Sequence, residues 1–273
     1  MPTSLANKWV LITGASSGIG AAAARAFAAA GANVLLGARR LDRLETVAAE
    51  ARRAGAPRAL VHALDVSQTR SVDAFVGWAA DQLSKGASGS RFDVLINNAG
   101  GAKGLDPVAT GKDPDWEFML QTNVLGLLRV TRACLPFMAD HPGSCIINIG
   151  SIAGRLAYEN GAAYCAAKAG ELAITRALRL ELCGKPVRVC TVDPGFVETE
   201  FSLVRFAGDK ERARKVYEGM NPLTAEDVAE TLVWVASRPT QVCIDELVIK
   251  PTDQAAIYKV HRRRGEGMKG LMD

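Results

Sequence analysis

Tyr164 and Lys168 are the residues whose types and spacing best suit chemistry. They stand four apart in a stretch with helical patterning, so their side chains project from one face, about one turn apart. A tyrosine alone is a poor base near neutral pH, because its ordinary pKa is about 10. A neighbouring ammonium stabilises the phenolate and lowers that pKa. The pair is therefore predicted to transfer protons.

Ser151 is predicted to lie beside this pair. It follows an apolar run, Cys145–Ile149, that has the composition of a buried strand. A hydroxyl at the carboxyl end of a parallel strand faces the crevice in which such sheets bind ligands, where it can hydrogen-bond the reacting oxygen. A Tyr-x-x-x-Lys pair by itself is more often a pair of surface side chains. The prediction therefore depends on the rest of the chain.

A glycine-rich turn follows the first apolar run and leads directly into an Ala-rich helix. Glycine lets the backbone approach a pyrophosphate closely, and a helix N-terminus offers free N–H groups and a favourable dipole. We expect this turn to bind a dinucleotide, although glycines used only for packing would give the same pattern. The turn is Thr13-Gly14-Ala15-Ser16-Ser17-Gly18-Ile19-Gly20.

The end of the second predicted strand indicates which dinucleotide is bound. An acidic side chain there would bind the free hydroxyls of the adenosine ribose. This chain has Arg39 and Arg40 instead. Guanidinium groups suit a 2′-phosphate in geometry and charge, so NADP is the predicted cofactor. The alternative is that one or both arginines are only the solvated start of a helix.

The pattern of the whole chain positions these residues. Short apolar runs alternate with longer helical stretches, which predicts an α/β fold: a single-domain, Rossmann-type, doubly wound parallel β-sheet with helices on both faces. The predicted strands are Trp9–Thr13, Asn33–Leu36, Ala59–Leu64, Asp93–Ile96, Cys145–Ile149, Val187–Val192 and Glu246–Ile249. The predicted helices are Ile19–Ala30, one from Leu41 to near Gly55, Gln68–Leu83, Trp116–Ala139, Ala162–Cys183 and Ala225–Ser237.

Two segments depart from this alternation. Residues 195–221 lack a regular pattern and are predicted to form a flap over the substrate. Residues 262–273 begin with three arginines and are rich in glycine, so a flexible tail is expected there. No linker interrupts residues 1–273, which are therefore predicted to form one domain.

Taken together, the motifs resemble the short-chain dehydrogenase/reductase family. The resemblance runs in order from the glycine turn to Thr199, through separated motifs that coincidence does not explain. Those motifs, besides the glycine turn, are Asn97-Asn98-Ala99-Gly100, Asn123, Ser151, Tyr164 with Lys168, Asp193-Pro194-Gly195 and Thr199.

The resemblance implies a role for each matching residue. Tyr164 would be the general acid/base, and Lys168 would lower its pKa and bind the nicotinamide ribose. Ser151 would orient the substrate oxygen, and Asn123 would hold a water in a proton relay. Asp65 would contact the adenine, Asn97 would stabilise the sheet beside the cofactor, and Val197 and Thr199 would anchor the nicotinamide amide. The same resemblance adds Val66, Ala99, Gly100, Pro194 and Gly195 to the cofactor contacts.

Two further segments resemble the NADP-dependent 3-hydroxy acid dehydrogenases, the branch that oxidises L-serine and L-allo-threonine. They are Val197–Phe206 and Asp245–Gln254. This resemblance implies interconversion of a 3-hydroxy acid and its 3-oxo acid. The substrate carboxylate would need a cation, for which Arg155 is the first candidate and Lys103 and Arg205 are the others. The alternative for each of them is a structural ion pair.

Rival functions remain open at this point. One is a general NADPH-dependent carbonyl reductase acting on aldehydes, diketones or sugars, and a more remote one is a non-catalytic NADP(H)-binding regulator. The net charge of +4 and the scattered basic residues argue against nucleic acid binding. The six cysteines lack metal-ligand spacing, so no metal is expected. No apolar run is long enough to span a bilayer and no signal peptide is evident, so a cytoplasmic protein is expected. Family resemblance implies a homotetramer.

Overall fold

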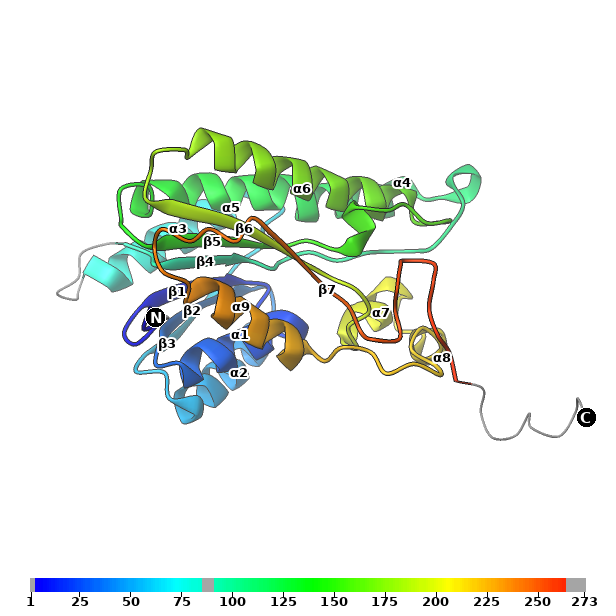
Figure 1. The fold of residues 1–273 in the computed structure, drawn as a ribbon, viewed down its shortest axis with the longest axis horizontal. Helices are drawn as coiled ribbons and strands as arrows, with labels where there is room; N and C mark the ends of the chain where they lie inside the picture. The colour runs from blue at the N-terminus through cyan, green and yellow to red at the C-terminus, as the bar shows by residue number, and fades with distance from the viewer. Residues whose placement is uncertain (1–2, 85–90, 264–273) are drawn as a thin grey trace, which may run out of the picture.

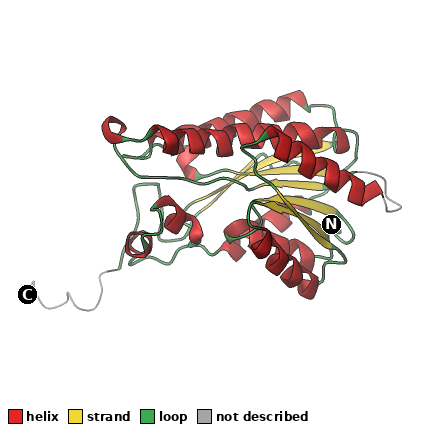
Figure 2. Ribbon diagram, turned by 180° about the vertical axis from the view of Figure 1, so that it is seen from behind, coloured by secondary structure: helices red, strands yellow, loops and turns green. Residues whose placement is uncertain are grey.

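A parallel sheet runs through the middle of the molecule, and helices cover both of its faces (Figure 1; Figure 2). The computed structural model describes residues 3–84 and 91–263. Within these residues seven strands pair in the order β3-β2-β1-β4-β5-β6-β7, all of them parallel. The predicted doubly wound sheet is thus confirmed. The strands are β1 (Trp9–Thr13), β2 (Asn33–Ala38), β3 (Ala59–Ala63), β4 (Val94–Asn97), β5 (Ser144–Ile149), β6 (Val187–Pro194) and β7 (Glu246–Ile249).

The central strands are buried from end to end. Every residue of β1, β4, β5 and β6 is buried, because helices cover both faces of the sheet. Such strands need continuous apolar runs rather than alternating ones. This explains why the sequence located the strands well. β1 and β7 have the predicted bounds, and β6 continues two residues further, to Pro194.

Two helical layers enclose two apolar cores. α1, α2 and α9 pack on one face of the sheet, and α3, α5 and α6 pack on the other (Figure 1). α9 begins with a capping box in which Thr224 and Asp227 bond each other's backbone. The helices on the two faces are α1 (Gly18–Ala29), α2 (Leu41–Ala54), α3 (Thr69–Ser84), α4 (Asp113–Met119), α5 (Gly126–Cys134), α6 (Ala162–Glu181) and α9 (Ala225–Ala236).

The predicted single helix Trp116–Ala139 is wrong. α4 ends at Met119, and a π-helical segment, Leu120–Leu125, leads into α5. Within that segment the Asn123 side chain donates to the Met119 carbonyl at 2.7 Å. A side chain that takes a helix carbonyl in this way competes with the main-chain ladder and widens the turn. The interruption therefore lies at a residue expected to be functional.

The predicted flap contains two short helices, α7 (Glu200–Arg205) and α8 (Lys210–Lys215). The chain after β7 lies beside them (Figure 1). Arg262 donates to the carbonyls of Val216 and Glu218. Arg263 pairs with Asp253 at 3.2 Å. These contacts involve the first two arginines of the predicted tail, whose flexibility stays a prediction. The rest of it, residues 264–273, lies outside the described residues.

Over residues 3–84 and 91–263, every helix is too short or too polar to cross a membrane.

Candidate active site

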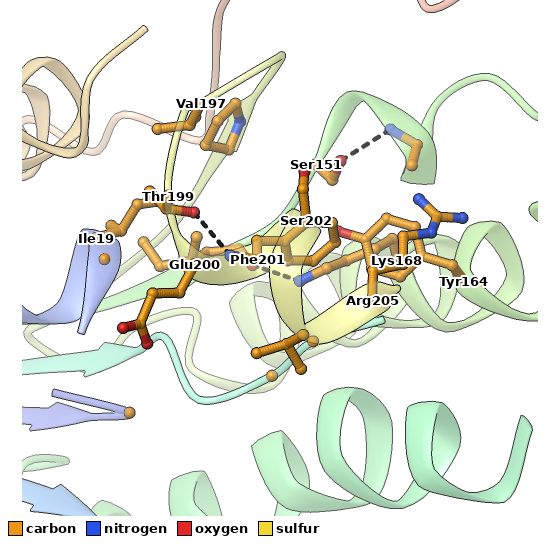
Figure 3. Close-up of a pocket in the computed structure, with 18 of the residues that line it drawn as sticks. Ile19, Ser151, Tyr164, Lys168, Val197, Thr199, Glu200, Phe201, Ser202 and Arg205 are labelled. Carbon is orange, nitrogen blue, oxygen red and sulfur yellow. Dashed lines mark hydrogen bonds between the residues drawn. The ribbon is translucent and has the colours of Figure 1, made fainter. Parts of the chain in front are cut away.

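A cavity of about 1150 Å³ opens where β1, β4, β5 and β6 end, beneath α7. Figure 3 shows Ser151, Tyr164, Lys168 and Arg205 grouped at one end of it and Ile19, Thr199 and Glu200 at the other. Most of the predicted site residues line this cavity. They are Gly14, Ser16, Ser17, Gly18, Ile19, Arg39, Arg40, Asp65, Val66, Ala99, Gly100, Ser151, Tyr164, Lys168, Pro194, Gly195, Val197, Thr199 and Arg205.

Tyr164 and Lys168 lie on the buried face of α6, close enough to interact. The Lys168 Nζ is 5.9 Å from the centre of the Tyr164 ring and donates to the Ile149 carbonyl at 2.9 Å. Both residues are more than nine-tenths buried. The carbonyl comes from the last residue of β5, so the sheet holds the ammonium in place. The spacing along the helix therefore produces the predicted pair.

The pKa of Tyr164 reflects opposing influences. Burial raises it above its ordinary value. The Lys168 ammonium, a hydrogen bond with Ser151 and the Arg205 guanidinium all lower it, while Glu171 raises it. Ser151 is held in place because its Oγ accepts from the Ala153 N–H at 3.1 Å, capping a short 3₁₀ turn. Three groups thus favour the phenolate that general-base catalysis requires.

Asn123 does not line the cavity, although the family resemblance assigns it a water. Its Nδ2 donates to the carbonyls of Gly101 and Met119, and its Oδ1 accepts from the Gly101 N–H at 3.0 Å. The residue is completely buried. A Cβ on Gly100 would meet the Asn123 Oδ1, so the turn needs glycine there. The structure therefore shows that Asn123 fixes the turn after β4. Its role in holding a water for the proton relay stays a proposal.

Asn97 likewise lies beside the cavity without lining it. Its Nδ2 donates to Asn148 on β5 and to Thr131 on α5. It thus joins two strands and a helix, which agrees with the part of its predicted role that concerns the sheet. Asn98, which belongs to the same motif but was assigned no role, does line the cavity. Its Nδ2 donates to the carbonyls of Thr13 and Gly14 and fixes the glycine turn.

The glycine turn has the backbone conformation that binding a pyrophosphate requires. Gly14 has φ +67° and Gly18 has φ +54°, both in the left-handed region that favours glycine. The Ser17 hydroxyl at the N-cap of α1 accepts from Arg40 at 2.8 Å instead of bonding the helix. The first N–H groups of α1 are thus left to bind an anion. Gly20 lies outside the cavity wall, and a Cβ there would meet Asn98 and Gly14 at 2.5 Å.

Replacing Gly14 with Ala is expected to weaken NADPH binding about tenfold or more. An alanine at this left-handed φ is strained by about 1 kcal/mol, and its Cβ would lie 2.8 Å from the Ala99 Cα. A fluorescence titration with NADPH measures the loss. Gly77→Ala on α3 is the matched control, because nothing lies within 4 Å of its added Cβ. Equal affinities of the two variants would contradict this account of the turn.

The arginines after β2 form a positively charged corner of the cavity. Arg40 donates to the hydroxyls of Ser16 and Ser17, and Arg39 lines the cavity beside it. The Glu200 carboxylate reaches Arg40 at 3.2 Å and Arg43 at 2.6 Å. Arg43, and then Arg40, lower the pKa of Glu200. A carboxylate held between two guanidinium groups shows that this corner accepts an anion.

Arg43 and Glu200 were both missed by the sequence argument. Arg43 lies three residues after Arg40 on α2, a helical spacing that was a usable signal. Glu200 is distant in sequence, and only the flap brings it to the phosphate corner.

Arg155, which was put first for the substrate carboxylate, forms the ion pairs that were its alternative role. Its Nη2 lies 2.5 Å from Asp193 and 2.7 Å from Glu246. Its charge is therefore already matched by two carboxylates, and it lines no part of the described cavity. Lys103 does not line the cavity. Its Nζ is 4.6 Å from the centre of the Phe118 ring, and the residue lines a second, small pocket that Tyr164 and Arg205 also border.

Arg205 is the predicted cation that the structure places beside Tyr164. Its guanidinium carbon is 5.6 Å from the ring centres of both Tyr158 and Tyr164. Its Nε donates to the Gly104 carbonyl at 2.9 Å, which holds the end of α7 against the chain after β4. The cavity wall also includes Gln254, the last residue of the segment Asp245–Gln254 singled out from the sequence, and, beyond that segment, Ile257, Tyr258 and Arg262.

Comparisons with known proteins agree with this geometry. A family model described as short chain dehydrogenase matches residues 8–209. The NADP-dependent 3-hydroxy acid dehydrogenase of Schizosaccharomyces pombe is 41% identical over 95% of this chain and 98% of the relative. The sulfoacetaldehyde reductase of Chromohalobacter salexigens is 43% identical over 90% of this chain and 94% of the relative.

A solved structure shares the fold as well. The closed form of a serine dehydrogenase complexed with NADP⁺ superposes with a TM-score of 0.83 and 38% identity, covering 93% of this chain and all of the other. The family model, these relatives and the buried Tyr164–Lys168 pair lead to one conclusion: the chain belongs to the short-chain dehydrogenase family.

Proposed function

We propose that this protein is an NADP(H)-dependent oxidoreductase that interconverts a 3-hydroxy acid, such as L-serine or L-allo-threonine, and the corresponding 3-oxo acid. The observation that carries the proposal is the position of Arg205. Its guanidinium lies in the cavity over the ring of Tyr164, the group that exchanges the proton. A carboxylate bound to it would bring the nearby hydroxyl of the same molecule to Tyr164.

The residues around the cavity fit NADP. The glycine turn and the N-terminus of α1 would hold the pyrophosphate, and Arg39, Arg40 and Arg43 would hold the 2′-phosphate. The carboxylate of Glu200 already occupies the position of an anion between Arg40 and Arg43. When bound, NADP supplies the acceptor for the hydride. The names of the 3-hydroxy acid dehydrogenase and of the NADP⁺ complex support this choice of cofactor.

The chain's own residues account for the proton chemistry. Tyr164, as phenolate, takes the hydroxyl proton of the substrate during oxidation and returns it during reduction. Lys168 stabilises that phenolate, and Ser151 donates a hydrogen bond that orients the reacting oxygen. Burial of Tyr164 and Lys168 strengthens the attraction between the ammonium and the phenolate and the hydrogen bond from Ser151, because water does not screen them. Each group then performs one task in the transfer.

The names of two relatives support an anionic substrate. A 3-hydroxy acid and sulfoacetaldehyde share one feature: a single carbon separates the anionic group from the reacting carbon. Arg205 lies over the ring of Tyr164, so its guanidinium is well placed to bind an anionic group at that separation from the reacting carbon. A bidentate guanidinium suits either a carboxylate or a sulfonate. The carboxylate is preferred here because serine dehydrogenase is also a structural relative.

We further propose a cytoplasmic homotetramer. Leu120, Leu125, Leu128 and Leu180 are exposed on α6 and on the helical segments beside it, and Leu180 is 78% exposed. Apolar side chains exposed on neighbouring helices are typical of an interface between subunits. Four free cysteines are buried as thiols, which agrees with a reducing compartment. Light scattering on the purified protein measures the assembly.

Reduction of NADP, followed by absorbance, tests the proposed function. The purified protein receives NADP or NAD with L-serine, L-allo-threonine or 3-hydroxyisobutyrate. The methyl ester of 3-hydroxyisobutyrate is the matched neutral substrate. Turnover of the acids with NADP, and little turnover of the ester, supports the proposal. Equal turnover of acid and ester identifies a general carbonyl reductase, and NADPH binding without any turnover identifies a regulator.

A further inference from the structure

Glu171 is a buried carboxylate beside the catalytic pair that the proposed mechanism leaves without a role. It lies one turn after Lys168 on α6, and its Oε2 is 2.6 Å from the Lys168 Nζ. Only 3% of the residue is exposed. Apart from the Lys168 ammonium, no hydrogen-bond donor among the described residues reaches this Oε2. A charge buried this deeply needs an explanation.

Lys168 is held from three sides as a result. Its Nζ contacts the Ile149 carbonyl at 2.9 Å, the Glu171 carboxylate at 2.6 Å and the ring of Tyr164 at 5.9 Å from the centre. Burial by itself would lower the pKa of Lys168. Glu171 and Tyr164 outweigh that effect, and the pKa is raised. Glu171 therefore keeps the ammonium charged and aimed at the phenol.

The other buried charges have partners of their own. Asp193, at the end of β6, accepts from Thr191 and pairs with Arg155. Arg155 also reaches Glu246 on β7. The π-helical segment Leu120–Leu125, which packs against α6, contributes no ionisable side chain. The charged or titratable groups that face Glu171 are thus Lys168 and Tyr164 on its own helix and Asp193 on the sheet.

Glu171 also changes its charge in the range where such an enzyme works. Burial raises the pKa of its carboxyl to about 7, although Lys168 opposes the shift. Its negative charge in turn raises the pKa of Tyr164. Ionised Glu171 cancels part of the Lys168 charge and makes Tyr164 a weaker acid. Neutral Glu171 leaves the whole charge of Lys168 to act on the phenol.

We propose that Glu171 is a positioning residue that acts through Lys168: it holds the ammonium against Tyr164 and, by gaining or losing charge, sets the pH range in which Tyr164 accepts a proton. The inference rests on the proposed roles of Tyr164 and Lys168. A purely structural ion pair would stabilise the fold and leave that pH range unchanged. A buried ion pair is by itself weak evidence for a stabilising role.

The test is the pH dependence of kcat/KM for oxidation with NADP in Glu171→Gln. The amide has the size of the carboxylate but no charge, so Tyr164 should ionise more easily. The acidic limb of the profile is expected to move to lower pH by about one unit. Glu171→Asp keeps a charge and should stay near the wild-type limb. Glu181→Gln, at the exposed end of α6, is the control for the same substitution.

A second measurement needs no substrate. Tyrosinate absorbance, titrated in the NADP-bound wild type and in Tyr164→Phe, isolates the ionisation of Tyr164, since the chain has only four tyrosines. The Tyr164 signal should move to lower pH in Glu171→Gln by the same amount. If this signal and the limb coincide with wild type, or move to higher pH, the proposal is overturned. If no hydroxy acid is turned over, the proposed function fails, and the absorbance titration still tests Glu171.

Discussion

Replacing Tyr164 with Phe is expected to lower kcat about a thousandfold while NADPH binding changes little. The variant loses only the hydroxyl and keeps the ring. The centre of that ring lies 5.6 Å from the centre of the Phe201 ring, and the Arg205 guanidinium lies over it. General acid–base catalysis of this kind contributes ~10²–10⁴ to the rate. Steady-state kinetics with the best hydroxy acid measures kcat. Fluorescence titration with NADPH measures binding.

Tyr158→Phe is the matched control for this experiment. Tyr158 lies at the same distance from Arg205, and burial raises its pKa to about 12, so its hydroxyl stays protonated at working pH. Its loss is expected to have a much smaller effect on kcat than the loss of the Tyr164 hydroxyl. Equal effects of the two substitutions would show that Tyr164 does not carry the proton.

Replacing Arg205 with Met is expected to lower kcat/KM for the hydroxy acid about a hundredfold. Leaving a substrate carboxylate without its cation in a half-buried cavity costs ~2–5 kcal/mol. The loss should fall mainly on KM, because Arg205 binds the carboxylate and takes no proton. Turnover of the methyl ester of the same substrate should fall much less, by the part that comes from the effect of the Arg205 charge on the pKa of Tyr164. Steady-state kinetics of the wild type and of Arg205→Met, with the acid and with its ester, measure these changes.

Lys103→Met is the matched control for Arg205→Met. Both substitutions remove one predicted cation, but Lys103 packs on Phe118 and, unlike Arg205, does not line the main cavity. Its removal should leave the kinetics with hydroxy acids almost unchanged. A large loss in Lys103→Met together with a small loss in Arg205→Met would show that the carboxylate binds on the Lys103 side.

The fold was predictable because the central strands are buried on both faces. Continuous apolar runs such as Trp9–Thr13 can then be located without knowing what lies around them. The π-helical segment Leu120–Leu125 could not be located in this way. It depends on hydrogen bonds from the Asn123 side chain to Gly101 and Met119, and the first of these is a contact between elements. The local periodicity of the sequence does not reveal such a contact.

The candidate site was predictable where neighbours in sequence are neighbours in space. Tyr164 with Lys168 and the glycine turn are of this kind. Charge pairing between segments that are distant in sequence could not be predicted. The sequence left Arg155 open between a substrate contact and an ion pair, because its partners Asp193 and Glu246 are distant in sequence and reach it only through β6 and β7. For the same reason Glu171 was overlooked, since only the fold shows that it is buried against the ammonium.

Helix α7 joins the two ends of the cavity. Glu200 in its first turn is paired with Arg40 and Arg43, and Arg205 in its last turn lies over Tyr164. A 2′-phosphate that takes the two arginines must first break the Glu200 ion pairs, so part of its binding free energy is spent on releasing the helix. Thermodynamic linkage then makes the effect mutual. Whatever factor the cofactor adds to the affinity for the hydroxy acid, the hydroxy acid adds to the affinity for the cofactor.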